Sequence, residues 1–443
     1  MWRCTGSLPS QERPTIVFFP EGAFGPTNNC VGIGLELQRV GARVVFVVEE
    51  SFRGTLEARG FEERLMRLKP SPEVPEEPGQ FWKDFIRDTA PEFRKSTRQQ
   101  LSTLIRPIWS ELIDGAMFVN ARLSEIFEEV RPDVIVQDNV VAFPAVPASG
   151  VPWVRIASCN PLEIKDPALP PAFSGLPLAD RSEWDAFRQA YRVLHADLHR
   201  SFNAFVQGQG APPLPDGEFI HESPYLNLYN YPAELDYPRS RPLPERWQRL
   251  ESCVRTPESA FAVPDSWGEG KVIYLSLGSL GSADTVLMQR LIDLLASSQH
   301  HVVVSLGPQH HSLKMAENMV GAEFVPQTAV LSQVDLVITH GGNNTVTESM
   351  HFGKPMIVLP LFWDQHDNAQ WVDETGFGAH LRPYSFTDQE FYAAIDRLLG
   401  DERLHSRLRG ISLRLQQHPG TTRAAALIQQ LARSRTQRPT ARR

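Results

Sequence analysis

The sequence predicts an α/β protein with two parallel sheets in series. Short β-branched runs alternate with longer amphipathic stretches from residue 15 onward, which is the pattern of strand–helix–strand units. The same alternation starts again at residue 271, after a proline-rich stretch. The length of 443 residues also exceeds what one hydrophobic core usually organises. We therefore expect two domains, each built around its own sheet.

Each half contains several runs that are typical of buried strands. In the first half, the expected strands are residues 15–19, 44–48, 132–136 and 151–156. In the second half, they are residues 271–276, 301–305, 335–339 and 355–359. Helical periodicity lies between and after them, at residues 31–40, 81–130, 181–207, 285–297 and 401–433. Pro91 and Pro107 should break the second of these helices, because proline lacks the backbone donor that a helix interior needs.

This order of elements favours two Rossmann-like domains that face a central cleft. Clusters of proline mark the long loops and the linker between the halves. The expected division is an N-terminal tail at 1–13, a first domain at 14–238, a linker at 239–270, a second domain at 271–400, a C-terminal helix at 401–435 that could cross back, and a basic tail at 436–443.

The composition is that of an ordinary globular protein, with 42% hydrophobic and 22% charged residues. A formal net charge of -8 provides no basic field for a polyanion, so nucleic acid is not an expected partner. The four cysteines form no CxxC pair, which argues against a zinc site or a disulfide framework and favours a reducing cytoplasm. No run approaches the ~20 apolar residues that span a bilayer. We expect no metal and no membrane contact.

The residues after one expected buried strand predict a site for a diphosphate. His340 closes the strand, and the following glycines, including Gly342, let a ligand approach the backbone before a helix starts near Asn344. Amides at a helix N-terminus favour anions. The His340 ring and the Thr345 hydroxyl would add donors. Glu348 stands one turn further along the same face, where a carboxylate can accept both hydroxyls of a ribose.

Other residues converge on the same edge of the predicted sheet. Asp364 and Gln365 follow another expected strand, and their polar atoms suit the vicinal hydroxyls of a hexose. Phe324 offers a flat face for a uracil ring. Gly278 and Ser279 end the first strand of this half and could contact the phosphates.

Each of these residues also has a purely structural interpretation. Thr345 and Glu348 have the spacing of a capping box, which stabilises a helix without any ligand. Asp364 with its neighbour could be only a polar turn, and a lone Phe324 is more often core than stacking platform. The convergence of all of them on one sheet edge favours the functional interpretation.

Three motifs in this half resemble the donor signature of the large UDP-glycosyltransferase family. They are Phe-Val-Pro-Gln at 324–327, His-Gly-Gly-Asn-Asn-Thr-x-x-Glu at 340–348 and Asp-Gln-x-x-Asn-Ala at 364–369. The likeness continues more loosely over nearly the whole chain. The resemblance implies a GT-B fold. It also implies an enzyme that takes a UDP-sugar as co-substrate and inverts the anomeric carbon of the sugar, with no metal and no cofactor. The first domain would hold the acceptor and the second the donor.

Carried over by position, the resemblance assigns a role to each donor residue. Phe324 would replace the usual Trp under uracil, and Gln327 would assist the nucleoside. The diphosphate would be held by His340, Asn344 and Thr345, with Gly278 and Ser279 in the turn on the phosphate side. Glu348 would take the ribose, and Asp364 with Gln365 would take the sugar. A Gln at the last position resembles glucose users more than galactose users, so UDP-glucose is the expected donor.

The first half departs from the family pattern at the general base. In the family this is a His in a turn after the first strand, paired with an Asp further on. Here Pro26 stands in that place, and proline cannot take a proton. Asp138 resembles the partner Asp, and our hypothesis is that it is the base, directly or through water; a helix cap is the alternative. Glu21 and the amides of Asn28 and Asn29 could orient the acceptor.

Several alternatives follow from the missing histidine. The acceptor could already be acidic, for example a phenol, a thiol or a carboxylate, and need little base catalysis. The chain could instead bind a sugar nucleotide without transferring it. A third possibility is an epimerase of similar fold, which the Asp-Gln-x-x-Asn-Ala stretch disfavours. The lining expected from residues 81–113 and 161–173 is apolar and aromatic, which favours a small molecule of that kind as acceptor, although core packing explains it equally well.

Overall fold

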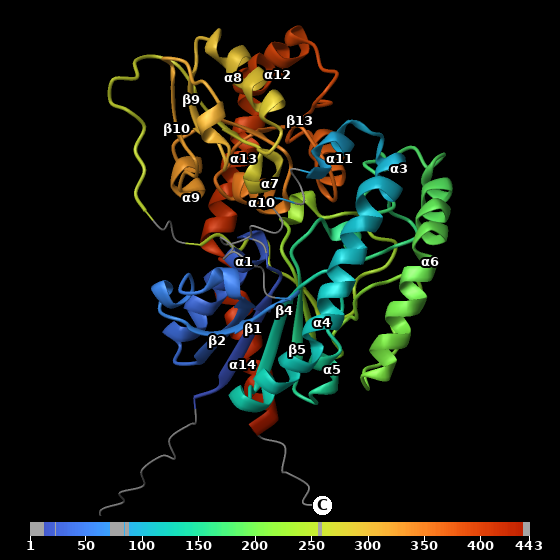
Figure 1. Cartoon of the computed structure of the whole chain (residues 1–443). Coiled ribbons are helices and arrows are strands. Elements are labelled where there is room, and N and C mark those ends of the chain that lie inside the picture. The colour runs from blue at the N-terminus through green and yellow to red at the C-terminus, as the bar shows by residue number, and fades with distance from the viewer. Residues whose placement is uncertain (1–12, 23, 71–83, 85–87, 256–258, 437–443) are drawn as a thin grey trace, which may run out of the picture.

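Two parallel sheets, one in each half of the chain, form the framework of the molecule (Figure 1). The structure, a computed structural model, describes residues 13–22, 24–70, 84, 88–255 and 259–436. Helices connect most of the strands, as crossovers between parallel strands require. The predicted α/β fold with two Rossmann-like domains is confirmed.

The first sheet contains seven described strands, all parallel. In spatial order they are β3 (Glu62–Met66), β2 (Arg43–Glu49), β1 (Thr15–Pro20), β4 (Val134–Asp138), β5 (Trp153–Ala157), β6 (Leu226–Tyr229) and β7 (Trp247–Arg249). Pro20 of β1 pairs with Asp138 of β4. The carboxyl ends of these two central strands therefore lie side by side.

The second sheet contains six described strands, which are also parallel. In spatial order they are β10 (Met319–Ala322), β9 (His301–Ser305), β8 (Val272–Ser276), β11 (Leu336–Thr339), β12 (Met356–Val358) and β13 (Gly378–His380). Thr339 at the end of β11 pairs with Ser276 on one side and Val358 on the other. The segments after β8, β11 and β12 thus leave the sheet at one edge, where ligands bind in α/β folds.

Helices lie between the strands and at the end of the chain. The longer ones are α1 (Phe24–Arg39), α4 (Arg106–Val130), α6 (Trp184–Gly208), α8 (Thr285–Ala296), α10 (Asn343–His351), α11 (Gln365–Glu374), α12 (Asp388–Gly400), α13 (Glu402–Gln417) and α14 (Gly420–Thr436). The short ones are α3 (Thr97–Gln100), α5 (Ala145–Ala148), α7 (Gly278–Gly281) and α9 (Gln327–Leu331). Within the described residues, no helix combines the length and the apolar character needed to cross a bilayer.

At two places, prolines affect the helices differently from what the sequence predicted. A π-helical turn, Leu101–Ile105, joins α3 to α4, and Pro107 lies in the first turn of α4, where its missing donor costs no hydrogen bond. The predicted break at Pro107 is therefore wrong. The single helix predicted for 401–433 is also wrong, because Pro419 keeps the preceding residue out of the helical region and separates α13 from α14.

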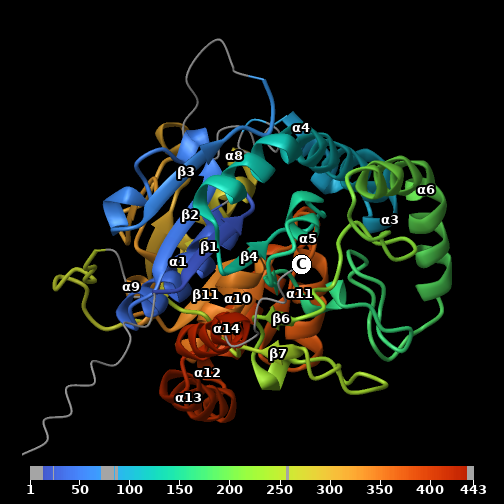
Figure 2. The same ribbon diagram turned by 90° about the horizontal axis from the view of Figure 1, so that it is seen from below.

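The last helix returns to the first half of the chain. α14 packs against α1, and Figure 2 shows the two helices close together. Ala424, Ala425 and Ile428 of α14 are buried in the same core cluster as Ile16 and Phe18 of β1. One face of the first sheet is therefore covered partly by α14, a helix that follows the second sheet in sequence.

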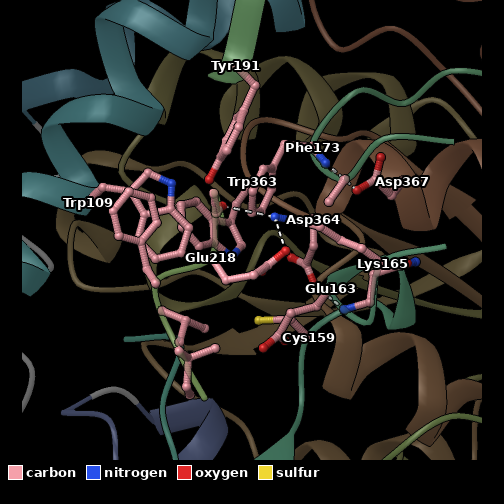
Figure 3. Close-up of a pocket in the computed structure, with 16 residues that line it drawn as sticks. Trp109, Cys159, Glu163, Lys165, Phe173, Tyr191, Glu218, Trp363, Asp364 and Asp367 are labelled. Carbon is pink, nitrogen blue, oxygen red and sulfur yellow. Dashed lines mark hydrogen bonds and ion pairs between the residues drawn. The ribbon is translucent and has the colours of Figure 1, made fainter. Parts of the chain in front are cut away.

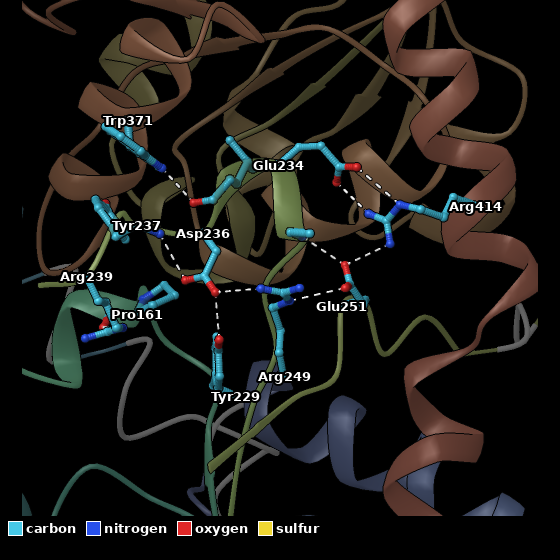
Figure 4. Close-up of polar contacts among 12 residues, drawn as sticks. Pro161, Tyr229, Glu234, Asp236, Tyr237, Arg239, Arg249, Glu251, Trp371 and Arg414 are labelled. Atoms are coloured by element: carbon cyan, nitrogen blue, oxygen red, sulfur yellow. Dashed lines mark hydrogen bonds and ion pairs between the residues drawn. The ribbon is translucent and has the colours of Figure 1, made fainter. Parts of the chain in front are cut away.

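Polar contacts hold the second half against the segment that leads into it (Figure 4). Arg414 of α13 forms ion pairs with Glu234 at 2.5 Å and with Glu251 at 3.1 Å. The indole nitrogen of Trp371 in α11 donates to the carbonyl oxygen of Leu235 at 2.6 Å. The predicted linker, residues 239–270, also contributes β7 to the first sheet. The domain limits stay predictions.

Candidate active site

The turn after β11 places a helix N-terminus at the carboxyl edge of the second sheet. His340 follows β11, and α10 begins three residues later. Gly341 has a φ of 89°, and a Cβ there would lie 2.6 Å from Val358 Cγ1, so this position needs glycine. Gly342 is the N-cap residue, and it has no side chain to cap the helix. The first amides of α10 therefore suit an anion.

Two glycines make room for the His340 ring. A Cβ at Gly278 would lie 2.6 Å from His340 Cε1, and a Cβ at Gly342 would lie 2.7 Å from its Nε2. Burial lowers the pKa of His340 to about 4, so the ring is neutral at pH 7 and can donate one hydrogen bond. The structure brings these three predicted residues together. Ser279 lies in α7, and its side chain is outside the described part of the chain.

Glu348 belongs to a buried hydrogen-bonded cluster on α10. Gln327 Nε2 donates to Glu348 Oε2 at 2.6 Å and to Thr345 Oγ1 at 3.3 Å. The Tyr274 hydroxyl donates to Gln327 Oε1 at 3.1 Å, and Arg255 Nη1 lies 3.3 Å from Glu348 Oε1. Thr345 lies inside α10 rather than at its cap, so it forms no capping box with Glu348. Arg255 was not predicted as a site residue, because it lies outside the three motifs.

The start of α10 also contacts the first half of the chain. Asn29 Nδ2 donates to Asn344 Oδ1 at 3.0 Å, and Asn344 Nδ2 donates to the carbonyl oxygen of Gly25 at 3.0 Å. Pro26 and Asn28 lie between these contacts, in the first turns of α1. The stretch that aligns with the family's base therefore lies against the predicted diphosphate site.

The predicted sugar residues follow β12 and have protein partners. Asp364 Oδ2 accepts from the backbone N–H of Asn160 at 2.8 Å, and burial raises the pKa of Asp364 to about 7. Gln365 Oε1 accepts from the backbone N–H groups of Leu361 and Phe362 at 3.0 and 3.2 Å. The side-chain oxygen of Gln365 is thus used by its own turn. Phe324 is 49% exposed, as a stacking surface would be.

An aromatic cavity lies beside Asp364, between the two halves (Figure 3). Its aromatic walls are Trp109, Phe173, Tyr191, Phe219 and Trp363. The ring centroid of Trp363 lies 4.5 Å from that of Phe173 and 5.1 Å from that of Trp109. Trp109 and Phe173 come from the two stretches predicted to line the acceptor site. The other three lie outside the two stretches predicted to line the acceptor site.

Four carboxyl groups line the same cavity: Glu163, Glu218, Asp364 and Asp367. Asp367 of α11 accepts from the backbone N–H groups of Phe173 at 2.6 Å and Gly175 at 2.8 Å, which fixes the loop of the first half on the second. Burial raises the pKa of Asp367 to about 8. In the part of the chain that the structure describes, no group of His, Cys, Asp and Glu is arranged to hold a metal ion.

Asp138 and Glu21 end neighbouring strands but differ in access. Asp138 is 3% exposed, and its Oδ1 accepts from the Ser158 hydroxyl at 2.7 Å. Its Oδ2 is buried with no hydrogen-bond partner among the described residues, and burial raises its pKa well above the usual range. Asp138 is not among the described residues that line either the aromatic cavity or a second cavity in the first half. Glu21 lines that second cavity.

Known proteins similar to this chain are sugar-transferring enzymes. A family model described as UDP-glucoronosyl and UDP-glucosyl transferase matches residues 234–414. Zeaxanthin glucosyltransferase of Pseudescherichia vulneris is 28% identical over 327 residues, which cover 70% of this chain and 76% of that protein. The 4'-demethylrebeccamycin synthase of Lentzea aerocolonigenes is 25% identical, covering 86% and 90%. The solved glycotransferase of kitacinnamycin covers 95% of this chain and 99% of its own, with a TM-score of 0.73 at 22% identity.

The fold and these relatives define the protein as a two-domain glycosyltransferase of the GT-B fold. Residues 234–414 match the model of the UDP-glycosyltransferase family, which the motifs of this half were predicted to resemble. The protein is an enzyme that uses a nucleotide-sugar donor and an acceptor, so the alternative of a binding protein without transferase activity is not supported. The roles predicted for single residues stay predictions.

Proposed function

We propose that this enzyme transfers glucose from UDP to a small apolar or aromatic acceptor, with inversion at C1 and without a metal ion. One observation carries the proposal: Gln327 of α9 is hydrogen-bonded to Thr345 and Glu348 of α10, the helix whose start has no side-chain cap and lies beside His340. Amides at the helix start suit the diphosphate, and the carboxylate of Glu348 suits the hydroxyls of the adjacent ribose. The two parts of a nucleoside diphosphate are thus matched by one short helix.

The sugar would extend from this helix toward Asp364, which follows the next strand of the sheet. A carboxylate can accept from two vicinal hydroxyls, and Asp364 has one oxygen beyond the one that Asn160 uses. The name of the relative zeaxanthin glucosyltransferase supports glucose as the sugar.

The acceptor would occupy the aromatic cavity, which adjoins Asp364. An aromatic lining combined with polar groups is typical of sites for small molecules. A ring stacked between Trp109 and Trp363 would gain both burial and aromatic contact. Asp138, the base of our hypothesis from the sequence, is buried and is not among the described residues that line either cavity, so a proton could reach it only through water. An acidic acceptor, such as a phenol, would need less base catalysis.

The test is mass spectrometry of reactions with UDP-glucose and a mixed library of phenols, aliphatic alcohols, macrolides and terpenoids. We expect a product with one added hexosyl unit, release of UDP, and a β-configured anomeric centre by proton NMR. His340→Ala should abolish the reaction, whereas His418→Ala, at an exposed position of the second half, should not. Conversion of UDP-glucose to an isomer without acceptor, or no consumption with any acceptor, would contradict the proposal.

A further inference from the structure

We propose that Glu21 is the general base that takes the proton from the attacking hydroxyl of the acceptor. The inference rests on the proposed transfer and names the group that replaces the histidine missing at Pro26. Glu21 directly follows β1 and precedes Pro26 closely in sequence, and its carboxylate can accept a proton.

The main chain fixes Glu21 at the edge of the first sheet. Its backbone N–H donates to the carbonyl oxygen of Asp138 at 2.8 Å, which continues the pairing of β1 with β4. The Thr27 hydroxyl donates to the carbonyl oxygen of Glu21 at 3.4 Å. Anchored on both sides, the residue is held in one position relative to the strands, as a catalytic group requires.

The side chain belongs to the wall of a cavity rather than to the core. This second cavity lies at the carboxyl ends of β1, β2 and β3 and against α4, and its apolar lining includes Phe19, Leu112 and Phe143. Val140 lines both this cavity and the aromatic cavity. Glu21 therefore stands beside the region in which the acceptor is proposed to bind.

The same turn reaches the predicted donor site. Gly25 and Asn29, which follow Glu21 closely in sequence, are hydrogen-bonded to Asn344 at the start of α10. Glu21 thus lies on the segment that connects the acceptor cavities with the place proposed for the diphosphate. A base for an inverting transfer has to stand at this junction, because the hydroxyl attacks C1 opposite the leaving phosphate.

The electrostatic surroundings suit a base that works near neutral pH. Burial, together with the nearby charge of Glu163, raises the pKa of Glu21 to about 7. Among the described residues, the other titratable groups near Glu21 are Glu49, Lys69 and Glu111 on the cavity wall, Asp138 on β4 and Cys159 after β5. Catalytic bases are most efficient when their pKa lies near the working pH.

The proposed step balances without any further reactant. The acceptor O–H bond breaks and its proton moves to the Glu21 carboxylate, while the oxygen forms a bond to C1 of the sugar. The bond from C1 to the β-phosphate oxygen breaks, and its electron pair leaves with the diphosphate. Glu21 then returns the proton to water.

The test compares Glu21→Gln with wild type on an aliphatic alcohol and on an acidic thiophenol. With the alcohol we expect kcat/KM to fall by about 10²- to 10⁴-fold and the rise of kcat/KM through about pH 7 to disappear. With the thiophenol, which is already ionised, the loss should be much smaller. Glu21→Asp should restore part of the alcohol reaction, and Glu57→Gln, at an exposed position of the first half, should behave as wild type.

Thermal melting and UDP binding of Glu21→Gln should match wild type, which separates a lost base from a lost fold. Equal losses on both acceptors would overturn the proposal. So would an unchanged pH profile in Glu21→Gln, or a profile that only Asp138→Asn removes. If wild type transfers no sugar at all, the proposed function fails instead, whatever the variants do.

Discussion

Arg255 Nη1 lies 3.3 Å from Glu348 Oε1, and this ion pair joins the segment before the second sheet to α10. Both side chains are largely buried, with 17% and 7% exposed. Burial raises the pKa of Glu348, while Arg255 and the hydrogen bond from Gln327 oppose that rise. The charge of the proposed ribose-binding carboxylate therefore depends on a residue outside the signature motifs.

Replacing Arg255 with Gln should weaken UDP binding, and more at pH 6 than at pH 8. Without the guanidinium, the buried Glu348 takes up a proton more easily, and a protonated carboxyl accepts ribose hydroxyls less well. We expect a loss of about tenfold in affinity at pH 6, or about 1.4 kcal/mol. Calorimetry of UDP binding at the two pH values measures it, with Arg39→Gln on the surface as control. The same affinity at both values would contradict this role.

Gly278→Ala should impair UDP binding, because the new Cβ would lie 2.6 Å from the His340 ring and displace it. The φ of 73° adds strain of roughly 1–2 kcal/mol for alanine. Gly410→Ala is the matched control: it lies inside α13 with no described atom within 4 Å of the added carbon, and should stabilise by roughly 0.5–1 kcal/mol. Calorimetry and thermal melting separate the two effects. Normal UDP affinity in Gly278→Ala would exclude a tight fit around His340.

We expect the ionisation of Asp367 to lower the free energy of unfolding as the pH rises from about 6.5 to 8. Its folded pKa of about 8 lies above its ordinary value, so its contribution to stability is complete at low pH and is lost as the pH rises through 8. Buried histidines such as His340 and His366, with pKa values lowered to about 4, act in the opposite direction, but only below about 6.5. The Asn side chain of Asp367→Asn cannot titrate, so the melting temperature of this variant should change less with pH in this window.

The exposed Asp185→Asn variant serves as the control for that experiment and should keep the slope of wild type. Melting curves from pH 6 to 9 measure the slopes. An Asp367→Asn slope as steep as that of wild type would assign the pH dependence to other groups, such as Glu21 and Asp364, whose pKa values are raised to about 7.

Phe173→Ala should raise the KM for an aromatic acceptor about tenfold and leave UDP binding unchanged. Phe173 contributes one wall of the aromatic cavity, and a ring contact provides about 0.5–1.5 kcal/mol beyond the buried area. Phe118→Ala removes an exposed ring of α4 and should change neither quantity. Steady-state kinetics with varied acceptor give the answer. An unchanged KM would place the acceptor elsewhere, for example wholly in the second cavity.

The strongest strands could be predicted because their signal is local. β1 and β8 are runs of buried apolar residues bounded by clear breaks. β3 was missed because its five residues begin with two glutamates at the edge of the sheet. β6 was missed because Asn227 interrupts its apolar pattern, although its side chain is satisfied by the main chain of Ser223.

The close grouping of the proposed donor residues could be predicted because several of them lie on one helix and the turns beside it. Gln327 Nε2 lies 2.6 Å from Glu348 Oε2, as expected of two residues that are proposed to bind the same nucleoside. Tertiary packing alone brings Arg255 to Glu348, and Tyr191 and Phe219 to the aromatic cavity. These three residues could therefore not be predicted. Glu21 was predicted only as a residue that orients the acceptor, because burial, which the sequence does not show, raises its pKa.

Calorimetric titration with UDP of wild type and Glu348→Gln measures most directly whether α10 holds the nucleotide. Wild type should bind one UDP per chain, and Glu348→Gln should bind it at least about tenfold more weakly, since hydrogen bonds to a charged group contribute about 1.5–3 kcal/mol. Thermal melting of the variant confirms that it is folded. No heat with wild type, or equal affinity in the variant, would contradict the assignment.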